Sequence, residues 1–166
     1  NTPSNYGISV GGFGIQIFEE NSVVYDGAHS LRLLGDGTTL TTWYQQFGNS
    51  GGTVATLQQQ TQYGFNVFMR RDGIIPASGN LIVELVDQSG NQILDNNNVA
   101  NAFSIDLTLL STNYASFIGQ FRTPTILPTS QYLRYRLSTP LTTGRSVYMD
   151  KASMGIMNQL YTSGPF

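Results

Sequence analysis

The sequence has no cysteine, one lysine (Lys151) and one histidine (His29), and only 11% of its 166 residues are charged. The absence of cysteine excludes disulfide bonds, thiolate catalysis and Cys-ligated zinc or iron–sulfur sites. The arginines are dispersed and the net charge is −2, whereas phosphate binding needs clustered lysine and arginine. No apolar run reaches the roughly eighteen residues that a transmembrane helix requires. We therefore predict neither a nucleic-acid nor a membrane partner.

A catalytic arrangement of residues is also missing. His29 stands in a turn before a predicted strand and has no partners at the spacing of a Ser-His-Asp triad. The glycine-rich stretch 11–14 lacks the lysine and the following helix that a phosphate-binding loop needs. The acidic residues show no evident acid–base pair in the sequence. We predict a protein that binds a partner and is not an enzyme.

What the sequence does contain is 40% apolar residues, arranged in short segments that alternate with polar residues. A period of two is typical of half-buried strands, and only one weak helical turn is expected, near 109–114. Turn signals recur roughly every eight to twelve residues, as in an all-β sandwich or barrel. The pattern predicts one domain over residues 1–166, with strands at 6–10, 15–18, 30–34, 38–47, 53–57, 63–70, 81–87, 92–94, 103–108, 114–122, 131–138 and 147–154.

The last predicted strand carries a carboxylate, Asp150, among apolar or small residues. The strand period places Tyr148, Asp150, Ala152 and Met154 on one side, which we expect to face the core. A carboxylate facing a core must be paired, hydrogen-bonded or bound to a metal ion. Two interpretations stay open: a cation site, and an aspartate that accepts hydrogen bonds from loop amides or pairs with an arginine.

Three phrases of the sequence are similar to strands of a known family. They are DGAHSLRL at 26–33, YGFNVFMR at 63–70 and VYMD at 147–150. They resemble the jelly-roll carbohydrate-binding modules grouped around families 4, 9 and 22, which share the galactose-binding-like sandwich. The resemblance implies a jelly roll of two antiparallel β-sheets. The sequence departs from the family pattern at Lys151, where the family has a second aspartate, and it lacks the family's opening N-G-x-F-E phrase.

The resemblance also implies a structural Ca²⁺ at the closing strand. In the modules that the sequence resembles, the position of Asp150 gives a carboxylate to this ion, which prefers six to eight oxygen ligands. Glu19, Glu20 and Asp26 lie near the turn before the strand 30–34 and are candidates for further ligands. Main-chain carbonyls around 27–29 would complete the shell.

A glycan-binding face would need flat aromatic rings for sugar C–H surfaces and polar groups for hydroxyls. We predict that such residues lie on the sides of the strands that face away from the core. Trp43 and Phe68 have an alternative place inside the core, and the arginines an alternative role on a solvated face or at a subunit contact. The candidate ligand-binding residues are Trp43, Phe68, Tyr132, Arg32, Arg70, Arg134, Arg136, Asn66 and Gln45.

Two functions follow as hypotheses. The first is a non-catalytic module that binds a glycan or polysaccharide on a concave sheet face. The second is a structural domain of a bacteriophage virion, such as a decoration, fibre or tail protein that contacts other virion subunits. The stretch 155–166 resembles the end of virion jelly-roll domains, which are also rich in Asn, Gln and Thr. Both predict an extracellular or virion-surface location.

A start at Asn-Thr-Pro without Met is expected for a processed product or a piece cut from a longer chain.

Overall fold

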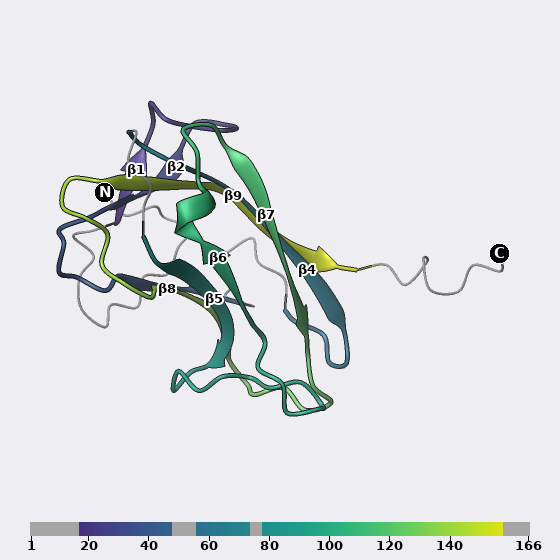
Figure 1. The fold of residues 1–166 in the computed structure, drawn as a ribbon. Coiled ribbons are helices and arrows are strands. Elements are labelled where there is room, and N and C mark those ends of the chain that lie inside the picture. The colour runs from purple at the N-terminus through teal and green to yellow at the C-terminus, as the bar shows by residue number, and fades with distance from the viewer. Residues whose placement is uncertain (1–16, 48–55, 74–77, 158–166) are drawn as a thin grey trace.

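The computed structural model describes residues 17–47, 56–73 and 78–157, and nearly all of its regular structure is β (Figure 1). Two antiparallel sheets form a sandwich. Sheet A has the order β1 (Ile17–Glu20), β2 (Ser30–Leu34), β9 (Ser146–Ile156), β4 (Gln62–Arg71) and β7 (Ala115–Arg122). Sheet B has the order β3 (Thr42–Gln46), β8 (Gln131–Leu137), β5 (Asn80–Asp87) and β6 (Ala102–Asp106). The predicted all-β jelly-roll sandwich is confirmed.

Most of the predicted strands are present with shifted ends. The strand expected at 38–47 is shorter, and 92–94 forms no strand but two isolated bridges, from Gln92 to Val86 and from Leu94 to Ala100. The helical turn lies earlier than expected, as the 3₁₀ helix η2 (Leu107–Leu109), with the Asp106 side chain accepting from the Thr108 amide at its start. The strand predicted at 6–10 and residues 53–55 lie outside the described part of the chain, and 56–57 are not in a strand.

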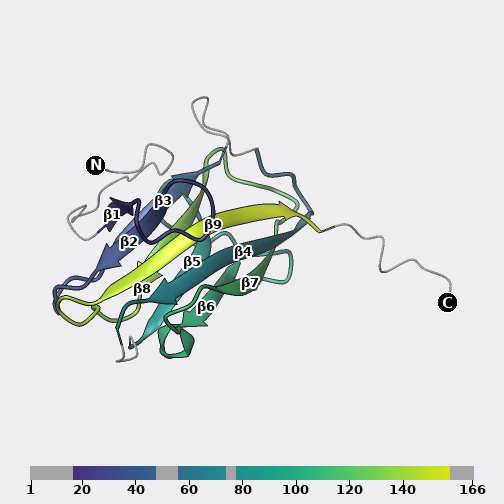
Figure 2. The same ribbon diagram turned by 90° about the horizontal axis from the view of Figure 1, so that it is seen from above.

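The core lies between the two sheets and is built from the inward positions of alternating strands. In β4 these are Tyr63, Phe65, Val67 and Met69, all at most 6% exposed. Figure 2 shows from above how sheet A lies over sheet B. Close packing at one point requires a glycine, because a Cβ at Gly119 in β7 would overlap the Phe103 ring of β6. Among the described residues, no helix is long and apolar enough to cross a membrane.

A β-bulge in β9 changes the side on which the closing strand's residues lie. Phe68 pairs with Asp150 and Asn66 pairs with Ser153, so two β9 residues stand opposite the single Val67. Lys151, at the bulge, has the left-handed φ of 48°. Before the bulge, Val147 and Met149 face the core and Tyr148 and Asp150 face outward. After it, Ala152 and Met154 pack against the core.

The prediction that Tyr148, Asp150, Ala152 and Met154 share one core-facing side is therefore wrong. A period of two holds only while the ladder is regular, and one extra residue transfers every later side chain to the opposite face. Asp150 is nonetheless 8% exposed. Its burial comes from the segment between β1 and β2, whose backbone contacts it from outside the sandwich.

Candidate functional site

The nine residues predicted to form one ligand-binding face lie in three separate places. Arg32, Asn66, Phe68 and Arg70 are on the outer face of sheet A, and Tyr132, Arg134 and Arg136 are on the outer face of sheet B, as the strand registers require. Trp43 and Gln45 are on the inner side of β3, between the sheets. The sequence pattern separated inward from outward positions on most strands, but it did not assign strands to sheets. Two outer faces therefore have to be considered.

Trp43 is a core residue, so its prediction as an exposed sugar platform is wrong. Its side chain is 0% exposed and its ring stacks on Tyr135 with centroids 5.1 Å apart and planes inclined by 5°. Thr41 and Phe47 lie on the same side of β3 and are also buried. Apolar burial of a ring this large outweighs any gain from exposing it. Gln45 follows Trp43 inward and accepts a hydrogen bond from the Tyr135 hydroxyl at 3.2 Å.

The outer face of sheet B carries a pair of tyrosines that are only half-buried. Tyr44 of β3 and Tyr132 of β8 meet edge to face, with ring centroids 6.4 Å apart and planes inclined by 87°. Tyr44 was not among the predicted site residues. The alternation along 38–47 contained the signal, because Tyr44 lies on the side of the strand opposite Trp43. The aromatic ring that β3 presents on its outer side is therefore that of Tyr44, next to Trp43 in the sequence.

Beside the tyrosines, a buried carboxylate holds two arginine side chains in place. Glu84 of β5 is 1% exposed and accepts hydrogen bonds from Arg134 Nε at 2.7 Å, from Arg136 Nε and Nη2 at 3.1 Å, and from Gln92 Nε2 at 2.9 Å. Arg134 Nη1 also donates to the Gly90 carbonyl at 3.0 Å. Burial alone would raise the pKa of Glu84, but the hydrogen bonds from Arg136, Arg134 and Gln92 outweigh it and lower the pKa to about 2. Fixed guanidinium groups next to half-exposed rings suit recognition of hydroxyl-rich ligands.

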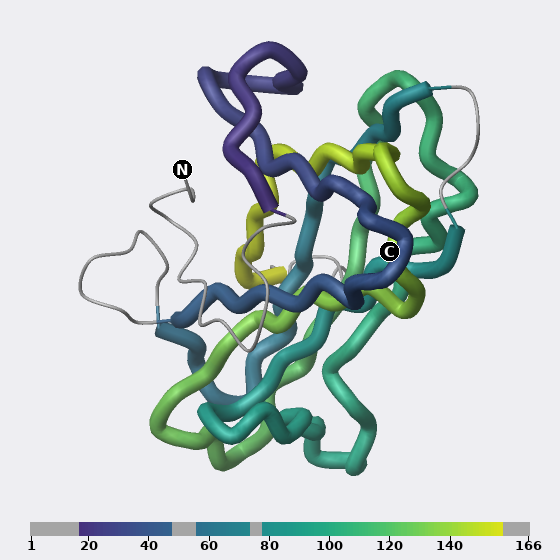
Figure 3. The backbone as a smooth tube through the Cα atoms, turned by 90° about the vertical axis from the view of Figure 1, so that its left-hand side faces the viewer, coloured from purple at the N-terminus to yellow at the C-terminus, as the bar shows by residue number. Residues whose placement is uncertain are grey.

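The outer face of sheet A is partly covered by the segment between β1 and β2, which Figure 3 shows in purple. Tyr25 of this segment stacks on Phe68 of β4, with ring centroids 3.9 Å apart and planes inclined by 12°. Tyr25 is nevertheless 45% exposed. Tyr114, just before β7, contacts Tyr25 at 5.5 Å and donates its hydroxyl to the Val23 carbonyl at 2.9 Å. Burial raises the pKa of the Tyr114 hydroxyl. Asn66, further along β4, accepts a hydrogen bond from Ser116 at 2.6 Å.

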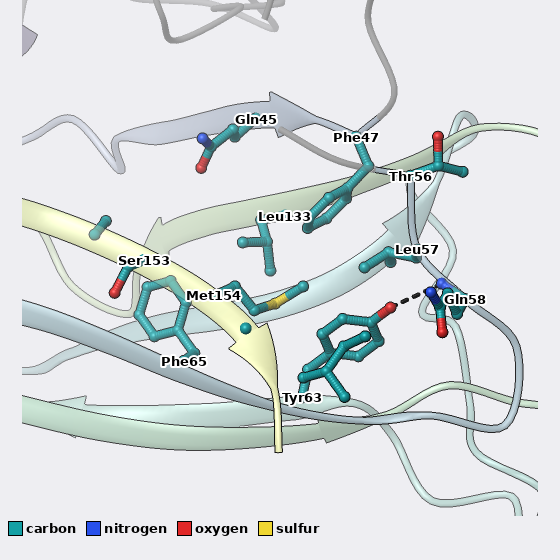
Figure 4. A pocket seen from close by; sticks show the side chains of 13 residues that line it. Gln45, Phe47, Thr56, Leu57, Gln58, Tyr63, Phe65, Leu133, Ser153 and Met154 are labelled. Atoms are coloured by element: carbon teal, nitrogen blue, oxygen red, sulfur yellow. Dashed lines mark hydrogen bonds between the residues drawn. The ribbon is translucent and has the colours of Figure 1, made fainter. Parts of the chain in front are cut away.

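A pocket of about 440 Å³ opens between the sheets beyond the bulge of β9. Phe47, Leu57, Tyr63 and Leu133 contribute to its mainly apolar wall, and Met154 of β9 closes one side (Figure 4). The Tyr63 hydroxyl accepts a hydrogen bond from the Gln58 amide at 2.8 Å, which fixes the ring at the rim. The pocket adjoins both ends of the undescribed stretch 48–55, so we assign no ligand to it.

The described residues do not fit the predicted calcium site. Asp150 Oδ2 accepts the amides of Tyr25 and Asp26 at 2.7 and 3.2 Å, and Oδ1 accepts the Lys151 amide at 2.6 Å. These three N–H donors occupy most of the lone-pair directions of the carboxylate, which a cation would also need. Of the open interpretations, the geometry favours an aspartate that accepts from loop amides. The structure does not test the sequence-based prediction that Ca²⁺ binds at Asp150, and the unfolding experiment below tests it against this interpretation.

The other predicted metal ligands also have protein partners. Glu19 lies 3.1 Å from the His29 ring, and Glu20 accepts from Ser22. Asp26 pairs with the Lys151 ammonium at 2.6 Å, and this contact lowers the pKa of Asp26 and raises that of Lys151. Among the described residues, no group of three metal-ligating side chains is assembled. The Lys151 ammonium is thus the partner of Asp26, which was predicted to be a metal ligand.

We expect that removing divalent cations with a chelator, or adding Ca²⁺, shifts the midpoint of thermal unfolding by less than about 1 °C, because Asp150 and Asp26 already have donors. The measurement is differential scanning calorimetry of the full chain in both conditions. A rise of several degrees with Ca²⁺ that disappears in Asp150→Asn would show that the ion binds there and would contradict this expectation.

Comparison with known proteins identifies the fold but no sequence relative. No protein-family model matches the sequence, and no curated protein matches it. The structure is similar to a carbohydrate-binding module of family 16 (TM-score 0.59, 14% identity, covering 86% of this chain and 87% of the module). It is equally similar to the xylan-binding CBM22-1 domain of Xyn10C from Paenibacillus barcinonensis (TM-score 0.58, 14% identity, covering 94% and 88%). The fold is the jelly roll of carbohydrate-binding modules.

A third similar structure comes from a virus. It is the enzymatically active domain of tailspike protein 4 of bacteriophage CBA120, with a TM-score of 0.61 and 13% identity. The match covers 93% of this chain but only 20% of the tailspike chain, so it concerns one portion of that larger protein. At these identities the comparisons establish the fold alone.

Proposed function

We propose that this domain is a non-catalytic carbohydrate-binding module that holds a glycan chain across the outer face of sheet B. The observation that carries the proposal is the half-exposed pair Tyr44 and Tyr132 beside two arginines fixed by a buried glutamate. Aromatic rings offer stacking surfaces for the C–H faces of sugars, and oriented polar groups hydrogen-bond their hydroxyls. The fold supports the same assignment, because the similar Paenibacillus domain is a xylan-binding domain.

The arrangement needs little ordering to receive a ligand. Arg134 is held by Glu84 and by the Gly90 carbonyl, so its guanidinium is oriented before any ligand arrives. Side chains fixed in advance lose less conformational entropy on binding, which favours affinity. Gln46 and Thr42 extend the same face along β3 and are half-buried. The face therefore runs the length of β3 and β8, which suits an extended chain more than a single small sugar.

We expect Tyr44→Ala and Tyr132→Ala each to weaken glycan binding by roughly tenfold, because each removes a stacking surface. A glycan array identifies a ligand of the wild type, and isothermal titration calorimetry then measures the variants. Ile118→Ala is the matched control: it removes a side chain that is 74% exposed on the opposite face of the sandwich, and it should leave the affinity unchanged. Equal affinity of wild type and both tyrosine variants would overturn the assignment to sheet B.

A second candidate, a structural domain of a bacteriophage particle, has one observation in its favour. The described chain matches part of a tailspike with the highest of the three TM-scores given above. The same experiments separate the two functions. A wild type that binds no glycan on the array and forms a symmetric oligomer by light scattering would favour the virion role, whereas glycan binding by a monomer favours the module.

A further inference from the structure

The second outer face, on sheet A, carries a row of alternating aromatic and arginine side chains. The strand registers align Phe18 of β1 with Arg32 of β2, Arg32 with Tyr148 of β9, and Tyr148 with Arg70 of β4. Neighbouring strands lie about 4.8 Å apart, so the row places two guanidinium-bearing residues roughly 10 Å apart on one face. No part of this row contributes to the face of sheet B.

Arg70 has no anionic partner within the part of the chain that the structure describes. Its guanidinium lies 5.8 Å from the Tyr114 ring centroid and 5.7 Å from that of Tyr148, so aromatic faces flank it. Its Nε is buried and has no hydrogen-bond partner among the described residues. Buried arginine donors are normally satisfied, because leaving one unpaired costs free energy. Arg32 donates one hydrogen bond, from its Nε to the Ser146 hydroxyl at 2.8 Å, and forms no ion pair with a described residue.

The acidic groups nearby are already engaged. Asp150 lies on the same face but accepts three main-chain amides, and Asp26 pairs with Lys151. Glu20, at the edge of the sheet, accepts from Ser22. The face thus has a guanidinium held between rings that forms no ion pair with any described residue. Such a group binds carboxylates well, because its planar fork matches two carboxylate oxygens.

An exposed ring completes the arrangement. One face of Tyr25 stacks on Phe68, and the residue remains 45% exposed. Tyr114 links this ring to the guanidinium, since it lies 5.5 Å from Tyr25 and 5.8 Å from Arg70. A flat ring open to solvent and a guanidinium without an ion pair among the described residues, both in contact with Tyr114, match a sugar ring that bears a carboxylate.

We propose that the outer face of sheet A is a second binding site, for an acidic sugar of the hexuronate class, with the sugar ring on Tyr25 and its carboxylate at Arg70. This site goes beyond the glycan face of sheet B and shares no residue with it. A carboxylate of the ligand supplies an ion-pair partner for the Arg70 guanidinium and balances its charge. Arg32 attracts further carboxylates of the same chain along the row.

The test is isothermal titration calorimetry of the wild type with hexamers of galacturonate, mannuronate and glucuronate, each against its neutral methyl ester. We expect at least one acid to bind at least tenfold more tightly than its ester, because the ester removes the charge but keeps the ring. Competition with acetate and with inorganic phosphate tests whether the carboxylate alone suffices: weak competition supports recognition of ring and charge together. If no acid binds with a Kd below about 10 mM, or every ester binds as well as its acid, the proposal is overturned.

Variants locate the site. Arg70→Gln and Tyr25→Ala are each expected to weaken binding of the acid about tenfold, and Tyr25→Ala keeps the test valid if Arg70→Gln is unstable. Arg122→Gln is the matched control, because it removes an exposed arginine from the same sheet and should change the affinity less than twofold. Tyr132→Ala should have no effect on the acid. If Tyr132→Ala weakens acid binding while Arg70→Gln does not, the acid binds on sheet B and this site is wrong, whatever the outcome for neutral glycans.

Discussion

Glu84→Gln is expected to lower the free energy of unfolding at pH 7 by about 3 kcal/mol. The carboxylate is 1% exposed and its pKa is about 2, against 4.5 for an unperturbed glutamate. A depressed pKa means that the folded state stabilises the ionised form, through Arg136, Arg134 and Gln92. The neutral amide cannot replace this charge, and it leaves two arginines without their counter-charge on the face of sheet B.

The same substitution should alter the dependence of stability on pH. Because the pKa of Glu84 is lowered on folding, its contribution is fully present above about pH 4.5 and is lost as the pH falls toward about 2. The wild type should therefore lose roughly 3 kcal/mol over this range, and Glu84→Gln should lose much less. Urea unfolding at several pH values measures both. Other acidic groups contribute in the same range, so the difference between the two proteins is the quantity to compare.

Asp106→Asn is the control for this prediction. Asp106 is exposed, and its pKa is also lowered, mainly by the Thr108 hydroxyl and amide. Loss of an exposed cap of this kind should cost much less stability than Glu84→Gln, since water replaces the missing contacts. If Glu84→Gln were as mild as Asp106→Asn, the buried network would not be a source of stability, and its role in orienting the arginines would need another basis.

The sequence was sufficient to predict the fold because its period of two is strong and local. The inward side of 63–70 and the alternation of Leu133, Tyr135 and Leu137 with Tyr132, Arg134 and Arg136 are all as the pattern indicates. Strand pairing is not local, however. β2 pairs with β9, more than a hundred residues later, and the sequence of neither segment indicates which strand is its partner. For this reason the predicted ligand residues that do face outward are divided between two opposite faces.

Two local features decided what alternation could not. The bulge at Lys151 reverses the sides of β9. To predict it, one would have to recognise from the sequence a residue that adopts a left-handed φ without being glycine. The partners of Asp150 are main-chain amides of 25–26, which carry no side-chain signal in the sequence. Glu84 was likewise not singled out, because an isolated glutamate in an apolar strand shows its role only when Arg134 and Arg136 are placed next to it.

Trp43→Ala is expected to lower the free energy of unfolding by about 3–5 kcal/mol, the usual cost of removing a large buried ring. Trp43 is 0% exposed, stacks on Tyr135 and belongs to the cluster that joins the two sheets. Its Nε1 is buried without a hydrogen-bond partner among the described residues, so the ring contributes through packing and apolar burial. Trp43→Phe keeps an apolar ring and should cost only about 1–2 kcal/mol.

The adjacent residue provides the sharpest comparison for this prediction. Tyr44→Ala removes a half-buried ring from the other side of the same strand, so it should cost about 1 kcal/mol or less while it weakens glycan binding. Urea unfolding followed by circular dichroism measures all three variants. Because Trp43 is the single tryptophan, a blue-shifted emission of the native wild type also reports its burial. An emission typical of exposed indole, or a mild Trp43→Ala together with a severe Tyr44→Ala, would mean that β3 presents its opposite face to the core and that Trp43 belongs to the ligand-binding side after all.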